Sequence, residues 1–522
     1  MAGGVAALAF AVGLPVWVAR SVARQPAAAL RYVSGGEPET LDPTLATAAL
    51  EVGLLGALYE GLVRIDPRTL APVPAAAERI ELDATGCRYT FRLRAGLRWS
   101  DGVALEARHF LYAWRRAADP RSGAPLQREA QLVASHARAV DGRTIRIVLE
   151  RPWPSLPAVL TLPCFLPLRP EVVEAAPRRW TRGRAVPGCG PFVLARWWPG
   201  RGLRLERNPY YRRPARLASI EAITIGAAAL GEATALRMYE AGEADLLFGV
   251  PAAARARLRG REDYAEGPRL GTVFLRCNLR RPDGRPTPLA DVRVRRALAL
   301  ALDREALCSA ALRGGGQPTR VLVPDGLGGY RSPGGLPEDA ARARRLLAQA
   351  QAAGAAPRPL RFGLLYSAGD ENARHGIEAL QRRWAEVLGV QLSLEPTERK
   401  IYFQTMRRRD YDMAWGSWLA DYPDPDNFLG IFRADSGNNR TGFADPRYEA
   451  LLDEAQRTVD RKRRLVLLAR AERRLLERAP CIPLYHTLWS WLRRPGLEGL
   501  VPNAMQQLCW ERLGWAPGRG PR

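Results

Sequence analysis

The first half of the chain contains short stretches in which apolar and polar residues alternate. Residues 88–94 and 144–149 alternate with the period of two that places successive side chains on opposite faces of a strand. Between them, the turn sequence Trp-Ser-Asp-Gly at 99–102 precedes a helical pattern from about residue 105 to 117. These elements predict a small module of strands and helices before Pro170.

Two further patterns predict structure in the middle of the chain. Residues 188–198 and 202–206 are predicted to form paired strands, which the Asn-Pro pair at 208–209 closes. Residues 292–302 have helical periodicity, and Asp303 is placed to cap a following helix.

The last third contains a strand, helix, strand unit. We expect a strand at 360–366, a helix at about 372–388 that Gly389 ends, and a strand at 390–394. Such a unit implies a parallel sheet with a right-handed crossover. Amphipathic helices are predicted to follow between residues 446 and 478.

Composition adds size and charge to this picture. With 522 residues and 47% hydrophobic content, the chain can bury large cores and should divide into two or three compact units. Its 78 basic and 54 acidic residues give a formal charge of +24, and nearly all basic residues are Arg, with Lys only at Lys400 and Lys462. This preference for Arg over Lys is better explained by the base composition of the genome than by a ligand. No nucleic-acid-binding motif accompanies it, so no nucleic-acid partner is predicted.

The N-terminal segment and the cysteines bear on location. Residues 2–18 are almost entirely apolar, as in a signal peptide or a short membrane anchor, and a cleavage site is available after Ala23. However, Arg20 and Arg24 follow the apolar run, the reverse of the usual arrangement. Seven widely spaced cysteines define neither a metal site nor a disulfide framework. We expect export to the periplasm, with inner-membrane anchoring left open.

Motifs of catalysis are missing. The chain contains no nucleophile elbow, no zinc-protease motif and no phosphate-binding loop, and its four histidines do not pair at metal-ligand spacing. Cys189, between two glycines, fits an entry turn to a strand better than a nucleophile. Asp421, Asp424 and Asp426 lack the loop Gly and terminal Glu of a calcium loop. We therefore expect a protein that is not an enzyme, with no catalytic residue, metal or cofactor.

The segment 415–429, with the sequence WGSWLADYPDPDNFL, is the strongest candidate for a binding site. It sets the Asp421 carboxylate among Trp415, Trp418 and Tyr422. An ammonium group would gain a charge-assisted hydrogen bond there and a cation–π contact. By itself the segment fits an acidic surface turn equally well.

Ordered motifs elsewhere carry a family resemblance. They are Glu37–Pro43, Tyr59–Leu62, Tyr89–Arg94 followed by Trp99–Gly102, Gly190–Phe192, Glu206–Tyr211, Ala241–Asp245 and Asp291–Leu298. With these motifs the chain resembles the oligopeptide-binding proteins of bacterial ABC importers, within extracellular solute-binding protein family five. The likeness runs from about Tyr32 to Leu513.

The resemblance implies an α/β, periplasmic-binding-protein-like fold with two lobes, a hinge and an extra small α+β domain. The hinge strands would cross near 271–278 and 483–489. The implied order is 1–30 signal peptide or anchor, 31–59 first lobe, 60–183 extra domain, 184–270 first lobe again, 271–486 second lobe, and 487–522 return to the first lobe and C-terminal tail.

The resemblance also implies a ligand site. Trp418 and Asp421 match a segment in which the Asp holds the N-terminal ammonium of a peptide. The backbones of 417–419 and of the loop 47–49 would pair with the ligand as added strands, which gives affinity without side-chain selectivity. The implied ligand-binding set is Asp421, Trp418, Ser417, Leu419, Trp415, Thr47, Ala48, Ala49, Arg407 and Tyr485.

One position departs from the family pattern. Some relatives have an Arg three residues before the Trp of this motif, where it meets the carboxylate of a short peptide; here that residue is Trp415, and Arg407 or a neighbouring arginine is the candidate substitute. The implied function is a monomeric receptor that captures oligopeptides and delivers them to membrane permease subunits powered by a separate ATPase. Alternatives are a binder of dipeptides, nickel or haem, a sensor with the same fold, and an exported hydrolase.

Overall fold

A single large mixed sheet runs through the protein. In this computed structural model, residues 29–177, 179–182, 186–225, 229–312 and 316–518 are described, so most of the predicted signal segment lies outside them. The strand order is β15-β14-β16-β12-β17-β11-β1-β10-β9-β8, with β13 beside β17. The strands are β1 Ala29–Gly35, β8 Phe192–Trp198, β9 Gly202–Arg207, β10 Ser219–Thr224, β11 Leu246–Phe248, β12 Tyr264–Cys277, β13 Gly316–Pro318, β14 Arg361–Ser367, β15 Gln391–Thr397, β16 Met413–Leu419 and β17 Cys481–Arg493.

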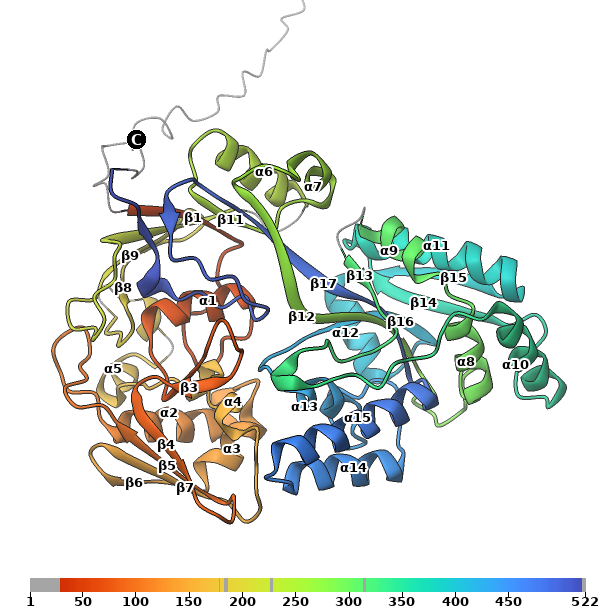
Figure 1. Ribbon diagram of the computed structural model, residues 1–522, viewed down its shortest axis with the longest axis horizontal. Coiled ribbons are helices and arrows are strands. Elements are labelled where there is room, and N and C mark those ends of the chain that lie inside the picture. The colour runs from red at the N-terminus through yellow and green to blue at the C-terminus, as the bar shows by residue number, and fades with distance from the viewer. Residues whose placement is uncertain (1–28, 178, 183–185, 226–228, 313–315, 519–522) are drawn as a thin grey trace, which may run out of the picture.

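Two long strands join the two lobes of the molecule. Figure 1 shows β12 and β17 crossing from the body that holds β1 and β8–β11, the first lobe, to the body that holds β14–β16, the second lobe. The two strands pair antiparallel from Tyr264↔Leu492 to Arg276↔Cys481, with shifts in register between Pro268 and Thr272 and between Val273 and Phe274. The fold is therefore of the two-lobed, periplasmic-binding-protein-like class, with the hinge strands where they were expected.

The first lobe gathers segments from both ends of the chain. Helix α1 (Ala49–Leu58) packs in its core, and α6 (Ala229–Glu240) and α7 (Ala252–Leu258) lie beside β11 and β12 (Figure 1). The C-terminal segment returns to this core, because the Trp510 indole is buried there and donates a 2.9 Å hydrogen bond to the Gly53 carbonyl. The short strands β18 (Leu497–Glu498) and β19 (Gly514–Trp515) pair in the same segment.

A small α+β module packs on the first lobe and shares its hydrophobic core. It contains a four-stranded antiparallel sheet in the order β4-β5-β7-β6, with helix α2 packed against α3 and the sheet. The predicted strands at 88–94 and 144–149 are confirmed as β5 and β7, and the predicted helix at 105–117 as α2. The bounds are β2 Val63–Ile65, β3 Pro72–Pro74, β4 Ala77–Leu82, β5 Arg88–Leu93, β6 Ala137–Asp141, β7 Thr144–Val148, α2 Ala107–Ala118, α3 Gln127–Ala134, α4 Leu156–Val159 and α5 Pro170–Ala175.

The second lobe contains the predicted strand, helix, strand unit. β14 and β15 pair in parallel, and Gly389 ends the intervening helix α11 with a φ of 67°, a left-handed conformation that suits glycine. Asp303 caps α9 as expected, since its Oδ1 accepts from the Ala306 N–H at 2.9 Å. The helices are α8 Val292–Leu300, α9 Arg304–Leu312, α10 Ala340–Ala352, α11 Glu371–Leu388, α12 Arg399–Arg408, α13 Pro425–Leu429, α14 Pro446–Arg457 and α15 Arg461–Arg478.

Candidate functional site

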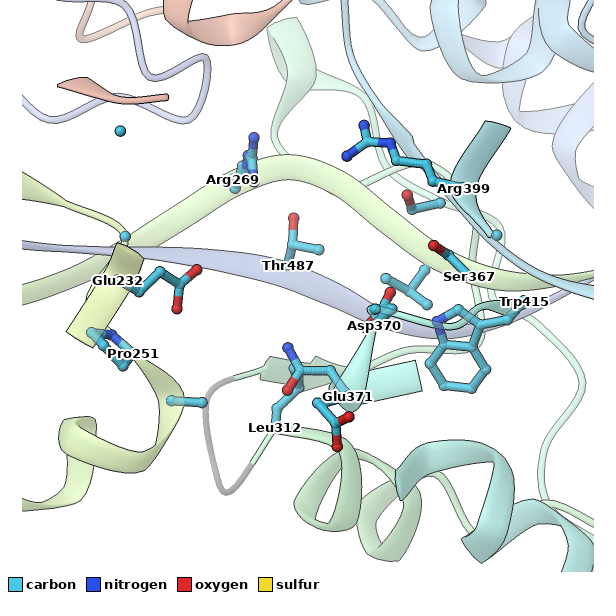
Figure 2. Close-up of a pocket in the computed structure, with 18 of the residues that line it drawn as sticks. Glu232, Pro251, Arg269, Leu312, Ser367, Asp370, Glu371, Arg399, Trp415 and Thr487 are labelled. Atoms are coloured by element: carbon cyan, nitrogen blue, oxygen red, sulfur yellow. The ribbon is translucent and has the colours of Figure 1, made fainter. Parts of the chain in front are cut away.

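A large cleft lies between the two lobes. Its volume is about 1630 Å³, above the roughly 300–1,000 Å³ of a typical small-molecule site. Figure 2 shows Glu232 and Pro251 of the first lobe on one side and Arg399 and Trp415 of the second lobe on the other. Strand β17 crosses between them with Thr487. The cleft thus has room for a ligand longer than an ordinary cofactor.

A second cavity of about 330 Å³ adjoins the cleft at Arg269, whose side chain borders both. The sequence-predicted residues are divided between the two spaces. Trp415, Ser417, Trp418, Arg407 and Tyr485 border the large cleft, whereas Thr47, Ala49, Leu419 and Asp421 border the smaller cavity, with Ala48 exposed between Thr47 and Ala49. The loop at 47–49 and the end of β16 therefore face one shared space.

Asp421 has no cationic partner among the described residues. Its closest polar neighbour is Asn427, whose Nδ2 lies 3.5 Å from Asp421 Oδ2. The side chain is accessible from the cavity, yet the surrounding protein is dense enough that desolvation raises the pKa of Asp421, which the amide of Asn427 partly offsets. The carboxylate is thus accessible to a ligand, and the hydrogen bond from Asn427 makes up for only part of the hydration that its negative charge loses.

Asn427 also fixes the position of this segment. Its buried Oδ1 accepts two hydrogen bonds, from the Trp418 indole at 2.9 Å and from the Asp421 backbone N–H at 3.1 Å. One amide therefore orients both residues of the predicted ammonium site. Sequence reasoning did not identify Asn427, although it lies only six residues beyond Asp421.

Strand β16 presents a free edge to the cleft. β12 pairs with the whole of β16, but on the other edge β14 reaches only Met413 and Ala414. The Ala420 N–H donates to Leu270 on the β12 side, so by the alternation of an antiparallel ladder the backbone groups of Ser417 and Leu419 point away from β12. The Ser417 C=O accepts a long hydrogen bond from Arg276 Nη2 at 3.5 Å, and the other backbone groups of these two residues are placed for pairing with an extended ligand.

The loop at 47–49 is held differently. The Glu51 carboxylate accepts hydrogen bonds from four backbone N–H groups, those of Glu39, Thr40, Thr47 and Ala48, at 3.0–3.2 Å. The loop is therefore rigidly placed, but two of the N–H groups expected to pair with a ligand are already engaged.

Trp415 contributes shape and no charge. It is 6% exposed, and its ring packs in the core of the second lobe near Gly376 and Tyr485, with a ring-centroid distance of 6.2 Å to the tyrosine. The Tyr402 hydroxyl donates to its carbonyl at 2.6 Å. Cationic groups must therefore come from elsewhere: Arg407 is exposed on α12 at the cleft, and Arg269, Arg276 and Arg440 also border it.

Arg276 is the principal residue that sequence reasoning missed. It lies in β12 within the apolar run Val273–Cys277 and is 5% exposed. An arginine inside a buried strand is unusual and was the available signal. Asp424 and Asp426, which the sequence did not favour as a calcium site, bind Arg464 at 2.8–3.0 Å and do not border the cleft.

Within the described ranges, no group of three or more His, Cys, Asp and Glu side chains is arranged to hold a metal ion. None of the helices in the described part of the chain combines the length and apolar character needed to cross a membrane.

Known proteins are similar over nearly the whole chain. A family model described as bacterial extracellular solute-binding proteins, family 5 Middle, matches residues 71–440. The chain is 32% identical to YgiS of Escherichia coli K12, named a probable deoxycholate-binding periplasmic protein, over 95% of this chain and 96% of that one. It is 28% identical to the periplasmic oligopeptide-binding protein OppA of Salmonella typhimurium, over 89% and 88%.

Solved structures agree with this similarity. The murein tripeptide-binding protein MppA of Escherichia coli aligns with a TM-score of 0.78 at 27% identity, over 93% of this chain and 98% of that one. OppA of Haemophilus influenzae, in complex with the peptide RPPGFSPFR, aligns with a TM-score of 0.75 at 27% identity, over 94% and 99%.

Proposed function

This chain belongs to family 5 of the bacterial extracellular solute-binding proteins, whose members serve ABC importers as binding components, and on this basis we propose that its ligands are peptides. One observation carries the proposal: among the described residues the Asp421 carboxylate has no cationic partner, and it lies beside the edge of β16 that β14 leaves unpaired at Ser417 and Leu419. A peptide supplies both an ammonium group and a backbone that can pair with a strand.

The binding mode follows from these contacts. The ammonium group of an extended peptide meets Asp421, and its backbone pairs with Ser417 and Leu419. Asn427 keeps the carboxylate and the Trp418 ring in place. The wide cleft leaves space for water around the ligand side chains, which keeps selectivity among them low.

Delivery would follow closure of the lobes. Bending of the hinge strands β12 and β17 brings the lobes together over the peptide. The closed protein, as a monomer, then docks on permease subunits that a separate ATPase drives. We propose a periplasmic location, as in the named relatives, with residues 1–30 acting as the export segment and with the lobe boundaries given above.

A second candidate ligand is an amphipathic anion of the deoxycholate type. The relative at 32% identity carries that ligand in its name. The cleft has apolar walls that include Phe248, Val273 and Leu488, and arginines at its border, which suit a flat apolar body with one carboxylate.

Thermal unfolding of the full chain with added ligands separates these candidates. A ligand at about a hundred times its Kd stabilises the folded state by roughly 2.7 kcal/mol. We expect free-amine tri- to pentapeptides to raise the Tm and their N-acetylated forms to raise it much less. Equal increases in Tm with free-amine and N-acetylated peptides would show that Asp421 does not bind the ammonium group. A shift with deoxycholate and none with any peptide would replace peptides by the second candidate.

A further inference from the structure

The sheet of the small module has an outer face that looks away from the hydrophobic core. On the inner side, helix α2 packs against the sheet, and the alternate residues Tyr89, Phe91, Leu93, Ile145 and Ile147 of β5 and β7 are buried. The residues between them point to the outer side, where they are exposed or half-buried. Figure 1 shows the module at the end of the first lobe far from α6 and α7. The outer face is therefore accessible to a partner.

Arginines dominate this outer face. The strand register places Arg79 of β4 opposite Arg92 of β5, and Arg138 of β6 opposite Arg146 of β7. Arg88 lies on the same side of β5 as Arg92. Directly opposed residues have Cβ atoms about 4.5–5.5 Å apart, and like charges in this arrangement destabilise a sheet. The two opposed arginine pairs thus cost stability.

The acidic residues of these strands offset only part of the charge. Glu81 pairs with Arg79 at 2.8 Å, whereas Asp141 accepts a backbone N–H of the turn between β6 and β7 at 2.7 Å. Within the part of the chain that the structure describes, the other four arginines of the face form no ion pair, and the Nε of Arg146 has no hydrogen-bond partner. The face therefore carries a positive charge that this sheet does not neutralise.

The arginines are spread over two dimensions. Four strands span roughly 14 Å across the sheet, and Arg88 and Arg92 lie roughly 13 Å apart along β5. Since the Debye length is about 8 Å at physiological ionic strength, neighbouring arginines act together on a partner. Val148, which is directly opposite Arg88, adds an apolar side chain that is 40% exposed. Basic and apolar side chains together suit the surface of a lipid bilayer.

The same positions do not fit a nucleic acid. Proteins that bind single strands on a sheet stack the bases on aromatic side chains. The outward positions of β4, β5 and β7 carry only arginine, glutamate, threonine and valine. A layer of anionic headgroups is therefore the better match to this charge.

We propose that this arginine face, formed by Arg79, Arg88, Arg92, Arg138 and Arg146, binds the anionic headgroups of a phospholipid bilayer. Guanidinium groups donate charge-assisted hydrogen bonds to phosphate oxygens. The contact is separate from ligand capture, because none of the five arginines borders the cleft or the smaller cavity. It holds the protein at the membrane, where permease subunits lie.

Co-flotation of the full chain with lipid vesicles tests this contact. Vesicles of phosphatidylcholine and phosphatidylglycerol in equal amounts are compared with vesicles of phosphatidylcholine alone, and the ratio of the two partition coefficients is measured. We expect a clear preference for the anionic vesicles that weakens as salt is added. Every variant retains residues 1–30, so a contribution of that apolar segment is common to all of them.

A fourfold variant assigns the preference to the face. It is Arg88→Gln/Arg92→Gln/Arg138→Gln/Arg146→Gln. Each arginine near an anionic bilayer strengthens binding about fivefold, so we expect the ratio to fall by about 10- to 100-fold. The Tm should not fall, because the substitutions relieve repulsion between like charges.

A matched control removes the same net charge elsewhere. Its four arginines are exposed, and each lies on a different helix of the second lobe. The control is Arg345→Gln/Arg382→Gln/Arg457→Gln/Arg473→Gln. Its ratio should stay close to that of the wild type.

The outcomes decide the proposal. Equal losses in the two variants would show that the overall charge attracts the protein to vesicles, and would overturn the assignment to this face. Equal partition of the wild type onto both kinds of vesicle would overturn it as well. If the face instead binds a single-stranded oligonucleotide and does not prefer anionic vesicles, a linear polyanion replaces the membrane. Peptide binding should be unchanged in the face variant, so the two proposals fail independently.

Discussion

The hydroxyl of Ser155 donates a 2.8 Å hydrogen bond to Oδ2 of Asp426, joining segments 271 residues apart in the sequence. Ser155 precedes α4 of the small module, and Asp426 lies in α13 of the second lobe. Beside this contact, Arg128 of the module pairs with Asp435 at 2.9 Å. The two lobes are therefore linked through the small module as well as through the hinge strands, so this link must be preserved or broken when the lobes move.

Arg464 should be critical for the stability of this link. It binds Asp424 in a bidentate manner at 2.8 Å and Asp426 at 3.0 Å, and its side chain is 7% exposed. Arg464→Met would leave the Asp424 carboxylate without its cationic partner, and breaking a buried ion pair in this way typically costs about 3–5 kcal/mol. Urea unfolding measures this, and the midpoint should fall markedly.

The neighbouring Arg463 provides the control. It pairs with Glu454 at 2.9 Å on the surface, with 68% of its side chain exposed. Arg463→Met should change the free energy of unfolding by about 0–1 kcal/mol. Equal effects of the two substitutions would show that the buried network does not stabilise the fold.

Asp426 should make stability depend on pH. Burial, followed by the nearby Asp424 carboxylate, raises its pKa from 3.8 to about 7. Between these values the folded state holds a proton that the unfolded state has lost, so this group's contribution to stability falls as pH rises through that window. Asp426→Asn cannot ionise.

The variant's free energy of unfolding relative to wild type should therefore become more favourable from about pH 4 to about pH 8. Urea unfolding across this range gives the difference directly. A constant difference between variant and wild type would contradict the assignment of the titration to Asp426.

Asp421→Asn should weaken peptide binding and spare the fold. Loss of a charge-assisted hydrogen bond to an ammonium group predicts about 10- to 100-fold lower affinity for free-amine peptides. N-acetylated peptides should bind the variant and the wild type alike. Calorimetry measures both, with Asp410→Asn as control, since Asp410 is exposed and does not border either cavity. Wild-type affinity in the Asp421 variant would contradict the assignment of Asp421 as the residue that binds the ammonium group.

The same carboxylate predicts the pH dependence of binding. Only ionised Asp421 pairs with an ammonium group, and desolvation raises the pKa of Asp421 above 3.8 in the free protein. Affinity for free-amine peptides should fall as pH decreases through this raised pKa, because protonation then competes with the ligand. In Asp421→Asn the affinity should not vary across that range. Identical pH profiles in the two proteins would rule out Asp421 as the titrating group.

Much of the fold could be predicted from local sequence patterns. The unit β14-α11-β15 followed from hydrophobic periodicity and from Gly389, and Asp303 capped its helix as expected. The strand predicted at 188–198 begins only at Phe192. Its first residues instead pack on α1: a Cβ on Gly190 would lie 2.6 Å from the Ala57 carbonyl oxygen, which requires glycine there. Periodicity carries no information about such close approach.

The site could be predicted only in part, because it is assembled from distant segments. Trp418 and Asp421 were found from one continuous stretch of chain. Glu51 engages the amides of the loop at 47–49, and Arg276 borders the cleft beside Ser417. Both depend on contacts that only the tertiary structure creates. The expected pairing of the loop at 47–49 with a ligand therefore remains a prediction. The N–H groups of Thr47 and Ala48 are already bound to Glu51, so such pairing would have to use other backbone groups of the loop.

The longer of the two irregularities in the pairing of β12 and β17 lies between Pro268 and Thr272. Inside it, Arg269 borders both cavities and Leu270 borders the smaller one. An irregular ladder bends more easily than a regular one, so a point of irregular pairing in the hinge strands coincides with a wall of the binding site. A ligand that contacts Arg269 would therefore lie against the part of the hinge strands that changes shape when the lobes move.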